Sequence, residues 1–260
     1  MTETAASHAT TGLTSLNIVA ADGTRIAWCE RGEGRPLLLI HGYFSDAATN
    51  WVRYAHAAVL ADAGFRVIMP DLRAHGQSGK PHDAAFYPSD ILADDMLALI
   101  DHLGLVDFDL GGYSLGGRTT ARLLARGVRP RTAVISGMGL TGLTQTQGRG
   151  AFFANVLDNL GTHEKYSPAW MAEAFLNQSG GDPKALRRIL DTFVDTSLEQ
   201  LGSFDLPIGV ICGDEDRDNG SAQELAAALP QGELITIPGT HMSAVTKPDL
   251  GIAIRDFLLA

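Results

Sequence analysis

A serine between two glycines is the strongest chemical signal in the sequence. The run Gly112-Tyr113-Ser114-Leu115-Gly116 follows an apolar segment and opens a helical pattern. A serine hydroxyl needs an adjacent base to act as a nucleophile at neutral pH. At a sharp turn from strand to helix the hydroxyl would project above the sheet, and the glycines would leave room where strand and helix come closest. We therefore predict that Ser114 is a catalytic nucleophile.

The base must be one of eight histidines. His241 lies in a glycine-containing loop between the last predicted strand and the last predicted helix, which would bring it to the carboxyl edge of the sheet. His41 directly follows an apolar run, where a buried polar residue typically anchors a loop by hydrogen bonds. We predict that His241 is the general base and that His41 is structural.

The acid that orients the base has more than one candidate. The run Asp214-Glu215-Asp216-Arg217-Asp218 follows an apolar strand, and four of its residues are acidic. An acid here gives the order serine, acid, histidine along the chain, which is one of the orders in which such triads occur. Asp216 is the first choice for this role, and Asp214 is the alternative.

Two backbone N–H groups can hold the oxyanion that forms during acyl transfer. One belongs to Leu115, directly after the nucleophile. The other is expected in the loop that follows the apolar run 36–40, and Tyr43 is the choice there, because Gly42 lets the chain turn sharply.

Apolar runs and helical patterns alternate along most of the chain, which predicts βαβ units and a mostly parallel sheet. Asp22-Gly23 predicts a hairpin between the first two strands. The expected strands are 16–20, 25–29, 36–40, 65–69, 108–112, 132–136, 208–212 and 233–237. The expected helices are 50–64, 89–103, 115–126, 221–229 and 247–259. The predicted fold class is thus α/β, a central, mostly parallel sheet flanked by helices.

The segment between Gly137 and Asp205 breaks this alternation and contains amphipathic helical patterns instead. We expect a helical cap or lid at residues 141–204, inserted after strand six, and a core made of residues 14–140 and 205–260. Residues 1–13 are expected to be a flexible N-terminus. The side chains expected to line a substrate pocket are Phe44, Tyr113, Phe152, Phe153, Trp170 and Met242.

Composition excludes several classes of partner. The formal net charge of −10 argues against nucleic acid. No apolar stretch is long enough to span a bilayer, and the N-terminus does not resemble a secretory signal, so a cytoplasmic location is expected. Cys29 and Cys212 are interpreted as reduced thiols. The expected partner is a small, largely apolar acyl substrate, with no metal and no organic cofactor; the oligomeric state is left open.

Five motifs in order resemble the α/β-hydrolase superfamily over nearly the whole chain: HGYFSD, DLRAHGQSGKP, GYSLGG, CGDEDRD and PGTHM. The resemblance implies that the residue after the glycine of the first motif, Tyr43, supplies an oxyanion N–H. It also implies that the acid lies three residues after Gly213, at Asp216. Ala74 departs from the family pattern, which usually has glycine there. Within the superfamily the chain looks most like small esterases, enol-lactonases and cofactor-free haloperoxidases.

These observations predict a serine hydrolase that cleaves a carboxylic ester or lactone through a Ser-His-Asp triad and an acyl-enzyme intermediate. A carbon–carbon bond hydrolase and a perhydrolase or haloperoxidase with the same triad are alternatives. A non-catalytic protein that binds small molecules on the same fold is an alternative from another class. Within the superfamily that the chain resembles, epoxide hydrolases and haloalkane dehalogenases normally carry aspartate at the nucleophile position, and both are disfavoured because this chain has Ser114 there.

Overall fold

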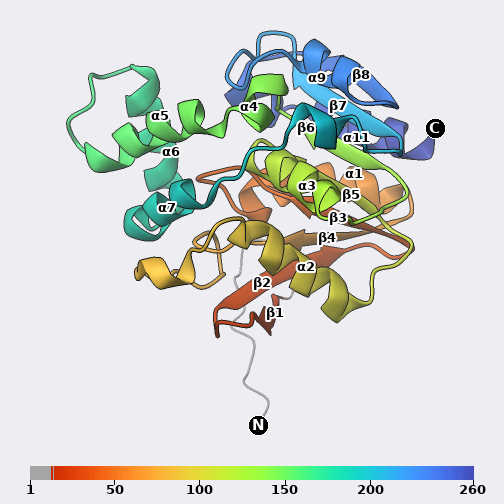
Figure 1. Cartoon of the computed structure of the whole chain (residues 1–260), viewed down its shortest axis with the longest axis horizontal. Helices are drawn as coiled ribbons and strands as arrows, with labels where there is room; N and C mark the ends of the chain where they lie inside the picture. The colour runs from red at the N-terminus through yellow and green to blue at the C-terminus, as the bar shows by residue number, and fades with distance from the viewer. Residues whose placement is uncertain (1–12, 14) are drawn as a thin grey trace.

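The computed structural model describes residues 13 and 15–260, so the predicted flexible N-terminus lies, apart from Leu13, outside the described residues. Eight strands form one sheet in the order β1-β2-β4-β3-β5-β6-β7-β8 (Figure 1). Their bounds are β1 Leu16–Val19, β2 Arg25–Arg31, β3 Arg35–Ile40, β4 Phe65–Pro70, β5 Asp109–Tyr113, β6 Ala133–Ser136, β7 Ile208–Gly213 and β8 Gly232–Ile237.

The strand directions confirm the α/β class. β1 pairs with β2 in antiparallel register, with Val19 opposite Arg25, as the Asp22-Gly23 hairpin predicts. β2 also runs antiparallel to β4, and every later pairing in the sheet is parallel. The carboxyl ends of β3, β5, β6, β7 and β8 therefore meet at one edge, which is where polar loops of an α/β sheet assemble a site.

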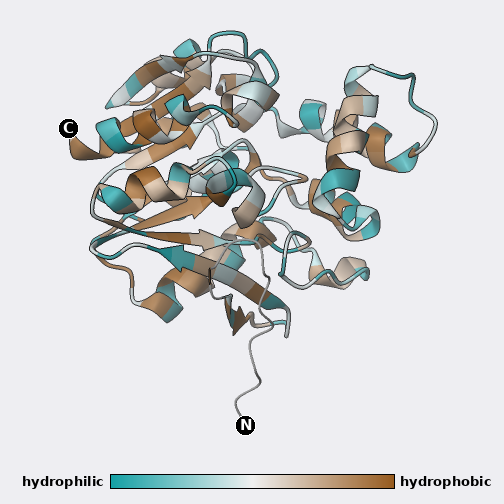
Figure 2. Ribbon diagram, turned by 180° about the vertical axis from the view of Figure 1, so that it is seen from behind, coloured by the Kyte–Doolittle hydropathy of each residue, from teal (hydrophilic) through white to brown (hydrophobic). Residues whose placement is uncertain are grey.

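Helices cover both faces of the sheet. α1 (His56–Asp62) and α11 (Pro248–Leu259) pack on one face, and α2 (Ile91–Leu103), α3 (Leu115–Ala125) and α9 (Ala222–Ala228) pack on the other (Figure 1). The central strands are largely hydrophobic, drawn in brown, in Figure 2. This follows from burial on both faces, which favours continuous apolar runs over alternating ones.

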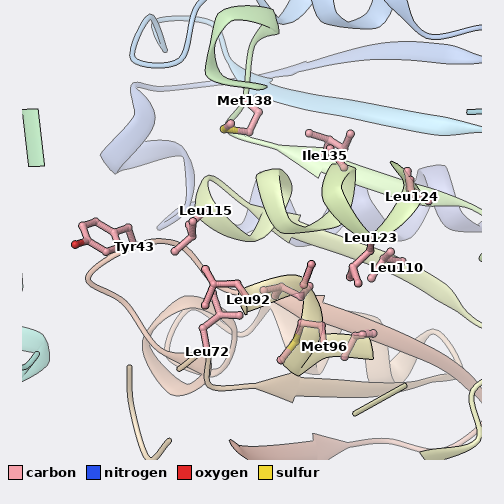
Figure 3. Packing of buried hydrophobic residues seen from close by; sticks show 14 of the residues in the cluster. Tyr43, Leu72, Leu92, Met96, Leu110, Leu115, Leu123, Leu124, Ile135 and Met138 are labelled. Carbon is pink, nitrogen blue, oxygen red and sulfur yellow. The ribbon is translucent and has the colours of Figure 1, made fainter. Parts of the chain in front are cut away.

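Alternate residues of each central strand enter different cores. Leu38 and Leu110 point to the side of α2 and α3, where they meet residues such as Leu123 (Figure 3). The two neighbours of Leu38 in sequence, Leu37 and Leu39, belong to the second core beneath α1 and α11. The two-residue period of the strand thus fixes two separate helix layers at once.

The helix expected at residues 50–64 is interrupted. Residues Ala48–Val52 form a short π-helix, and α1 begins only at His56. Ala55 separates the two with a left-handed backbone, at φ 63°, which no α-helix continues through. The sequence pattern was uniform across this break, so periodicity alone could not locate it.

The helical segment after strand six is present. It holds α4 (Leu140–Thr144), α5 (Thr146–Asp158), α6 (Pro168–Ser179), α7 (Pro183–Ile189) and α8 (Leu198–Leu201) between β6 and β7. α5, α6 and α7 lie to one side of the sheet in Figure 1, beyond the carboxyl ends of the strands. Ser167 and Asp182 cap the N-termini of α6 and α7, each directly before a proline at the first helical position.

Two buried histidines make the fold sensitive to acid. The pKa of His75 lies well below its ordinary value, chiefly because the ring is fully buried, and burial also lowers the pKa of His56. Below about pH 6.5 these histidines would be protonated in the unfolded chain but remain neutral in the folded one. The free energy of unfolding should therefore fall as the pH falls. We expect the free energy of unfolding, measured by urea titration, to drop between pH 7.5 and 5.5 by up to about 1.4 kcal/mol per pH unit for each such group.

A matched pair of variants checks this expectation. His75→Asn should flatten the pH dependence of the unfolding free energy, because one group that resists protonation is gone. Ser203→Ala, at an exposed position without a titratable group, should leave the dependence as it was. Equal slopes for the wild type and His75→Asn would contradict the assignment.

Candidate active site

Ser114 lies at the turn between β5 and α3, where its backbone adopts a strained conformation. Its φ of 53° and ψ of −111° are unusual for a residue with a side chain. Two hydrogen bonds hold the turn: the Ser114 N–H donates to Ser136 O at 2.8 Å, and the Arg118 N–H donates to Ser114 O at 2.9 Å. Ser114 is thus the single residue that joins β5 to α3, at a sharp change in chain direction.

The two glycines of the motif are needed because backbones touch there. A Cβ on Gly112 would overlap the backbone of Gly116, and a Cβ on Gly116 would overlap the carbonyl of Ile40. The start of α3 therefore lies directly against β5 and β3. Any other residue at either position would push the nucleophile turn away from the sheet.

His241 lies at the start of the short helix α10 (His241–Ala244), which follows β8. Thr240 and Ser243 form a capping box that fixes this turn. The Nε2 atom of His241 is 3.0 Å from Ser114 Oγ, and its Nδ1 atom is 2.8 Å from Asp216 Oδ2. The ring is thus bridged on both nitrogens, and Nδ1–H donating to the carboxylate leaves Nε2 as the acceptor for the serine proton.

Asp216 is a buried carboxylate with its other oxygen also occupied. The Asp218 N–H donates to Asp216 Oδ1 at 3.0 Å, and the residue is 5% exposed. Burial works to raise the pKa of Asp216, but the hydrogen bond and charge of His241, together with the Asp218 N–H, hold that pKa below its ordinary value. The carboxylate therefore stays ionised in the range where an imidazole changes its charge.

The alternative acid, Asp214, has a different contact. Its Oδ1 atom accepts a hydrogen bond from the Gly239 N–H at 2.7 Å, in the loop that leads to His241. The structure places Asp216, and not Asp214, at the imidazole.

The two backbone N–H groups expected to hold an oxyanion have no acceptor among the described residues. In the part of the chain that the structure describes, neither the Tyr43 N–H nor the Leu115 N–H donates a hydrogen bond to another residue. The loop that carries Tyr43 lies against the nucleophile, since a Cβ on Gly42 would be 3.5 Å from the Cβ of Ser114. Unpaired N–H groups beside a strained serine are the arrangement that an oxyanion requires.

His41 is held by two hydrogen bonds within the fold. Its Nδ1 atom is 2.7 Å from Gly42 O, and its Nε2 atom accepts the Leu72 N–H at 3.0 Å. The side chain is completely buried. This ring connects the oxyanion loop to the segment after β4, as expected of a structural residue.

A cavity of about 570 Å³ opens above Ser114 and His241. Five of the six side chains expected in a pocket line it: Phe44, Tyr113, Phe152, Phe153 and Met242. An aromatic ring of α5 touches one in the loop after β3: the ring centroids of Phe153 and Tyr43 are 4.8 Å apart. The wall is mostly apolar, and Tyr43 is tied to the cap through its hydroxyl, which donates to Leu186 O at 2.7 Å.

Trp170, the sixth expected pocket residue, does not line the cavity. The residues of α6 that do line it are Pro168, Met171, Ala172, Phe175 and Gln178, which recur every three or four positions on one helical face. Trp170 precedes Met171 by one residue and so lies about 100° around the helix, where its ring contacts Tyr166 at 5.4 Å. The helical period, applied strictly, would have selected Met171 and Phe175 instead.

Two polar residues that line the cavity, Asn50 and Arg149, were not predicted from the sequence. Asn50 was assigned to a helix start, and nothing in the sequence connected it with Ser114. Arg149 lines the cavity from α5, lies over the rings of Phe152 and Phe153, and pairs with Asp218 at 2.6 Å. No sequence motif marks either residue.

The described residues contain no group of three or more His, Cys, Asp or Glu side chains placed to hold a metal ion. None of the helices in residues 13 and 15–260 has the length and apolar character needed to cross a membrane.

Comparison with known proteins agrees with this geometry. Residues 35–139 match the family model described as alpha/beta hydrolase fold. The non-heme chloroperoxidase CPO-A1 of Kitasatospora aureofaciens is 30% identical over 91% of this chain and 96% of its own length. The chain belongs to the α/β-hydrolase family. A non-heme haloperoxidase of Rhodococcus erythropolis is 38% identical to it, over 42% of this chain and 38% of that protein.

Solved structures of α/β hydrolases show the same fold. A hydrolase from Pseudomonas aeruginosa PA01 superposes with a TM-score of 0.77 at 23% identity, covering 96% of this chain and all of that one. A thermophilic esterase from Thermogutta terrifontis gives 0.76 at 23% identity, over 94% of this chain and 98% of that one. Membership of the family supports hydrolase activity for this chain and leaves the bond that it cleaves to be argued from the site.

Proposed function

We propose that this α/β hydrolase cleaves a carboxylic ester or lactone through an acyl-enzyme on Ser114. The observation that carries the proposal is the continuous chain from Ser114 Oγ to His241 at 3.0 Å and from His241 to Asp216 at 2.8 Å. Nucleophile, base and orienting acid are within hydrogen-bond reach without any movement of the protein.

In the first half of the reaction, Ser114 Oγ attacks the carbonyl carbon while its proton passes to His241 Nε2. The carbonyl oxygen becomes an anion that the N–H groups of Tyr43 and Leu115 hold, and ionised Asp216 stabilises the imidazolium. His241 then returns the proton to the leaving alkoxide. The C–O bond breaks, and an alcohol leaves while the acyl group stays on Ser114.

In the second half, water takes the place of the alcohol. His241 Nε2 accepts a proton from that water as its oxygen attacks the acyl carbon, and the same two N–H groups hold the second oxyanion. Collapse expels Ser114 Oγ, which recovers its proton from His241, and a carboxylic acid is released. For a lactone, both products remain one molecule, a hydroxy acid.

The cavity wall favours an apolar acyl or alcohol group. Rings from both sides, Phe44 of the core and Phe153 of the cap, would enclose it, and removing them from water would contribute to binding. We propose that residues 141–204 act as the lid over this substrate. Turnover of p-nitrophenyl esters of increasing chain length would report how much of the cavity the acyl group fills.

A fluorophosphonate probe tests the proposal directly. The activated serine would displace the probe's fluoride and form a stable phosphonyl ester, which intact-mass and peptide mass spectrometry would locate at Ser114. We expect labelling of the folded wild type and none of Ser114→Ala. An unlabelled, folded wild-type protein would support the alternative, a small-molecule-binding protein on a hydrolase fold.

Perhydrolysis is a second candidate, favoured by the relationship to a non-heme chloroperoxidase over nearly the whole chain. Hydrogen peroxide in place of water would attack the acyl-enzyme, so that a peracid and free Ser114 result. This step uses the same residues and no metal. Peracid formation from acetate and peroxide, lost in Ser114→Ala, would support this activity.

A further inference from the structure

Asn50 is a buried amide that the mechanism above does not use. It lies in the short π-helix Ala48–Val52, it lines the cavity together with Ser114, and it is 3% exposed. π-helical turns are rare and occur often at functional sites.

One half of the Asn50 amide has a partner and the other half has none. Its Oδ1 atom accepts the Gly42 N–H at 3.0 Å, in the oxyanion loop. Because only an oxygen can accept that N–H, the amide orientation is fixed and Nδ2 must be the opposite atom. Within the described residues, Nδ2 is buried and has no hydrogen-bond acceptor.

A buried donor without an acceptor costs about 1–3 kcal/mol, so a site that retains one needs a reason. The backbone around Asn50 does not leave its side chain free to move away. The Asn50 N–H donates to Asp46 O at 2.9 Å, and the neighbouring Thr49 N–H donates to Asp46 Oδ1 at 2.6 Å. These two bonds fix the backbone that carries Asn50, and the bond from the Gly42 N–H to Oδ1 orients the amide itself.

Gly42 contacts both the Asn50 amide and Ser114. Asn50 and Ser114 both lie on the side of Gly42 where a side chain would stand, since a Cβ on Gly42 would be 3.6 Å from Asn50 Oδ1 and 3.5 Å from the Cβ of Ser114. Asn50 and Ser114 therefore approach the same face of Gly42, and the next residue along the chain is Tyr43, whose N–H is the proposed oxyanion donor. A pre-positioned donor there stabilises charge that develops on the substrate at no cost in reorganisation.

We propose that Asn50 is a third hydrogen-bond donor to the oxyanion, through Nδ2, beside the N–H groups of Tyr43 and Leu115. Its Oδ1 bond to Gly42 orients it for this role. The inference rests on the proposed acyl-enzyme function and adds a side chain to the catalytic machinery. It also identifies the substrate group bound there as an oxygen that gains negative charge in the transition state, as an ester or lactone carbonyl does.

Two variants separate this role from a purely structural one. Asn50→Asp keeps an acceptor for the Gly42 N–H but removes the donor and adds a charge. Asn50→Leu has a similar size and removes donor and acceptor without adding charge. If Nδ2 serves the oxyanion, both should lower kcat for a p-nitrophenyl ester by about 100-fold with KM changed less than about threefold, because the donor acts in the transition state.

Phenylboronic acid supplies a second readout, since its adduct with Ser114 is a tetrahedral anion. Its affinity should fall in both variants by a factor similar to the fall in kcat/KM, while melting temperatures stay within a few degrees of the wild type. Asn159→Asp, an exposed asparagine on the cap side, is the control for added charge and should behave as the wild type.

Three results would overturn the role proposed for Asn50. Near-wild-type kcat in Asn50→Asp would mean that only the bond to Gly42 counts, and would overturn the inference. A loss in Asn50→Asp with none in Asn50→Leu would mean charge repulsion alone, and would also overturn it. Failure of the wild type to be labelled at Ser114 by the fluorophosphonate would instead overturn the proposed function, and this inference with it.

Discussion

Replacing Ser114 by alanine is expected to lower kcat/KM for p-nitrophenyl esters by at least about a thousandfold. The variant lacks the Oγ atom that would form the proposed acyl bond, while the proposed oxyanion donors and the cavity remain. Those parts alone leave a residual rate well below that of the complete triad. Initial rates at substrate concentrations below KM would measure the loss.

The fold should tolerate this change. Alanine adds no atom to the tight turn, and the hydrogen bonds that hold it come from the backbone of residue 114. Melting temperatures should therefore stay close to the wild-type value. Ser203→Ala, at an exposed serine after α8, is the matched control and should retain full activity. A pure, folded Ser114→Ala enzyme with most of its activity would rule out this nucleophile.

Asp216→Asn is expected to lower kcat by about 10³- to 10⁴-fold. The amide keeps the shape of the carboxylate but presents either a donor to His241 Nδ1 or a neutral acceptor. The first favours the wrong tautomer of the imidazole, and the second no longer stabilises the imidazolium. Because the ring stays in place, KM should change little.

Asp214→Asn is the comparison for the acid. An asparagine Oδ1 can still accept the Gly239 N–H, so the loop before His241 should survive and kcat should remain within about tenfold of the wild type, as expected for a neutral hydrogen bond replacing a charged one. Measured side by side at one pH above 7, the two variants rank the acids. If Asp214→Asn were the more damaged enzyme, the acid would have to be reassigned.

The sequence by itself determined the architecture and the chemically active residue types. Continuous apolar runs such as Leu37–Ile40 encode strands buried on both faces, and their alternation with helical patterns encodes a parallel sheet. Glycines at 112 and 116 encode a close approach of backbones. These signals are local: each depends on a few consecutive residues, so pattern and composition were enough to predict them.

The tertiary structure alone decided what depends on contacts between distant residues. Composition does not separate Asp214 from Asp216; the family resemblance favoured Asp216, and the contact with His241, 25 positions after Asp216, distinguishes them in the structure. Met171 lines the cavity and Trp170 does not, because of the way α6 is turned about its axis. Asn50 lines the cavity with Ser114 in a segment separated from α1 by the break at Ala55. Side-chain direction and loop packing arise from the whole folded chain, and no short stretch of sequence contains them.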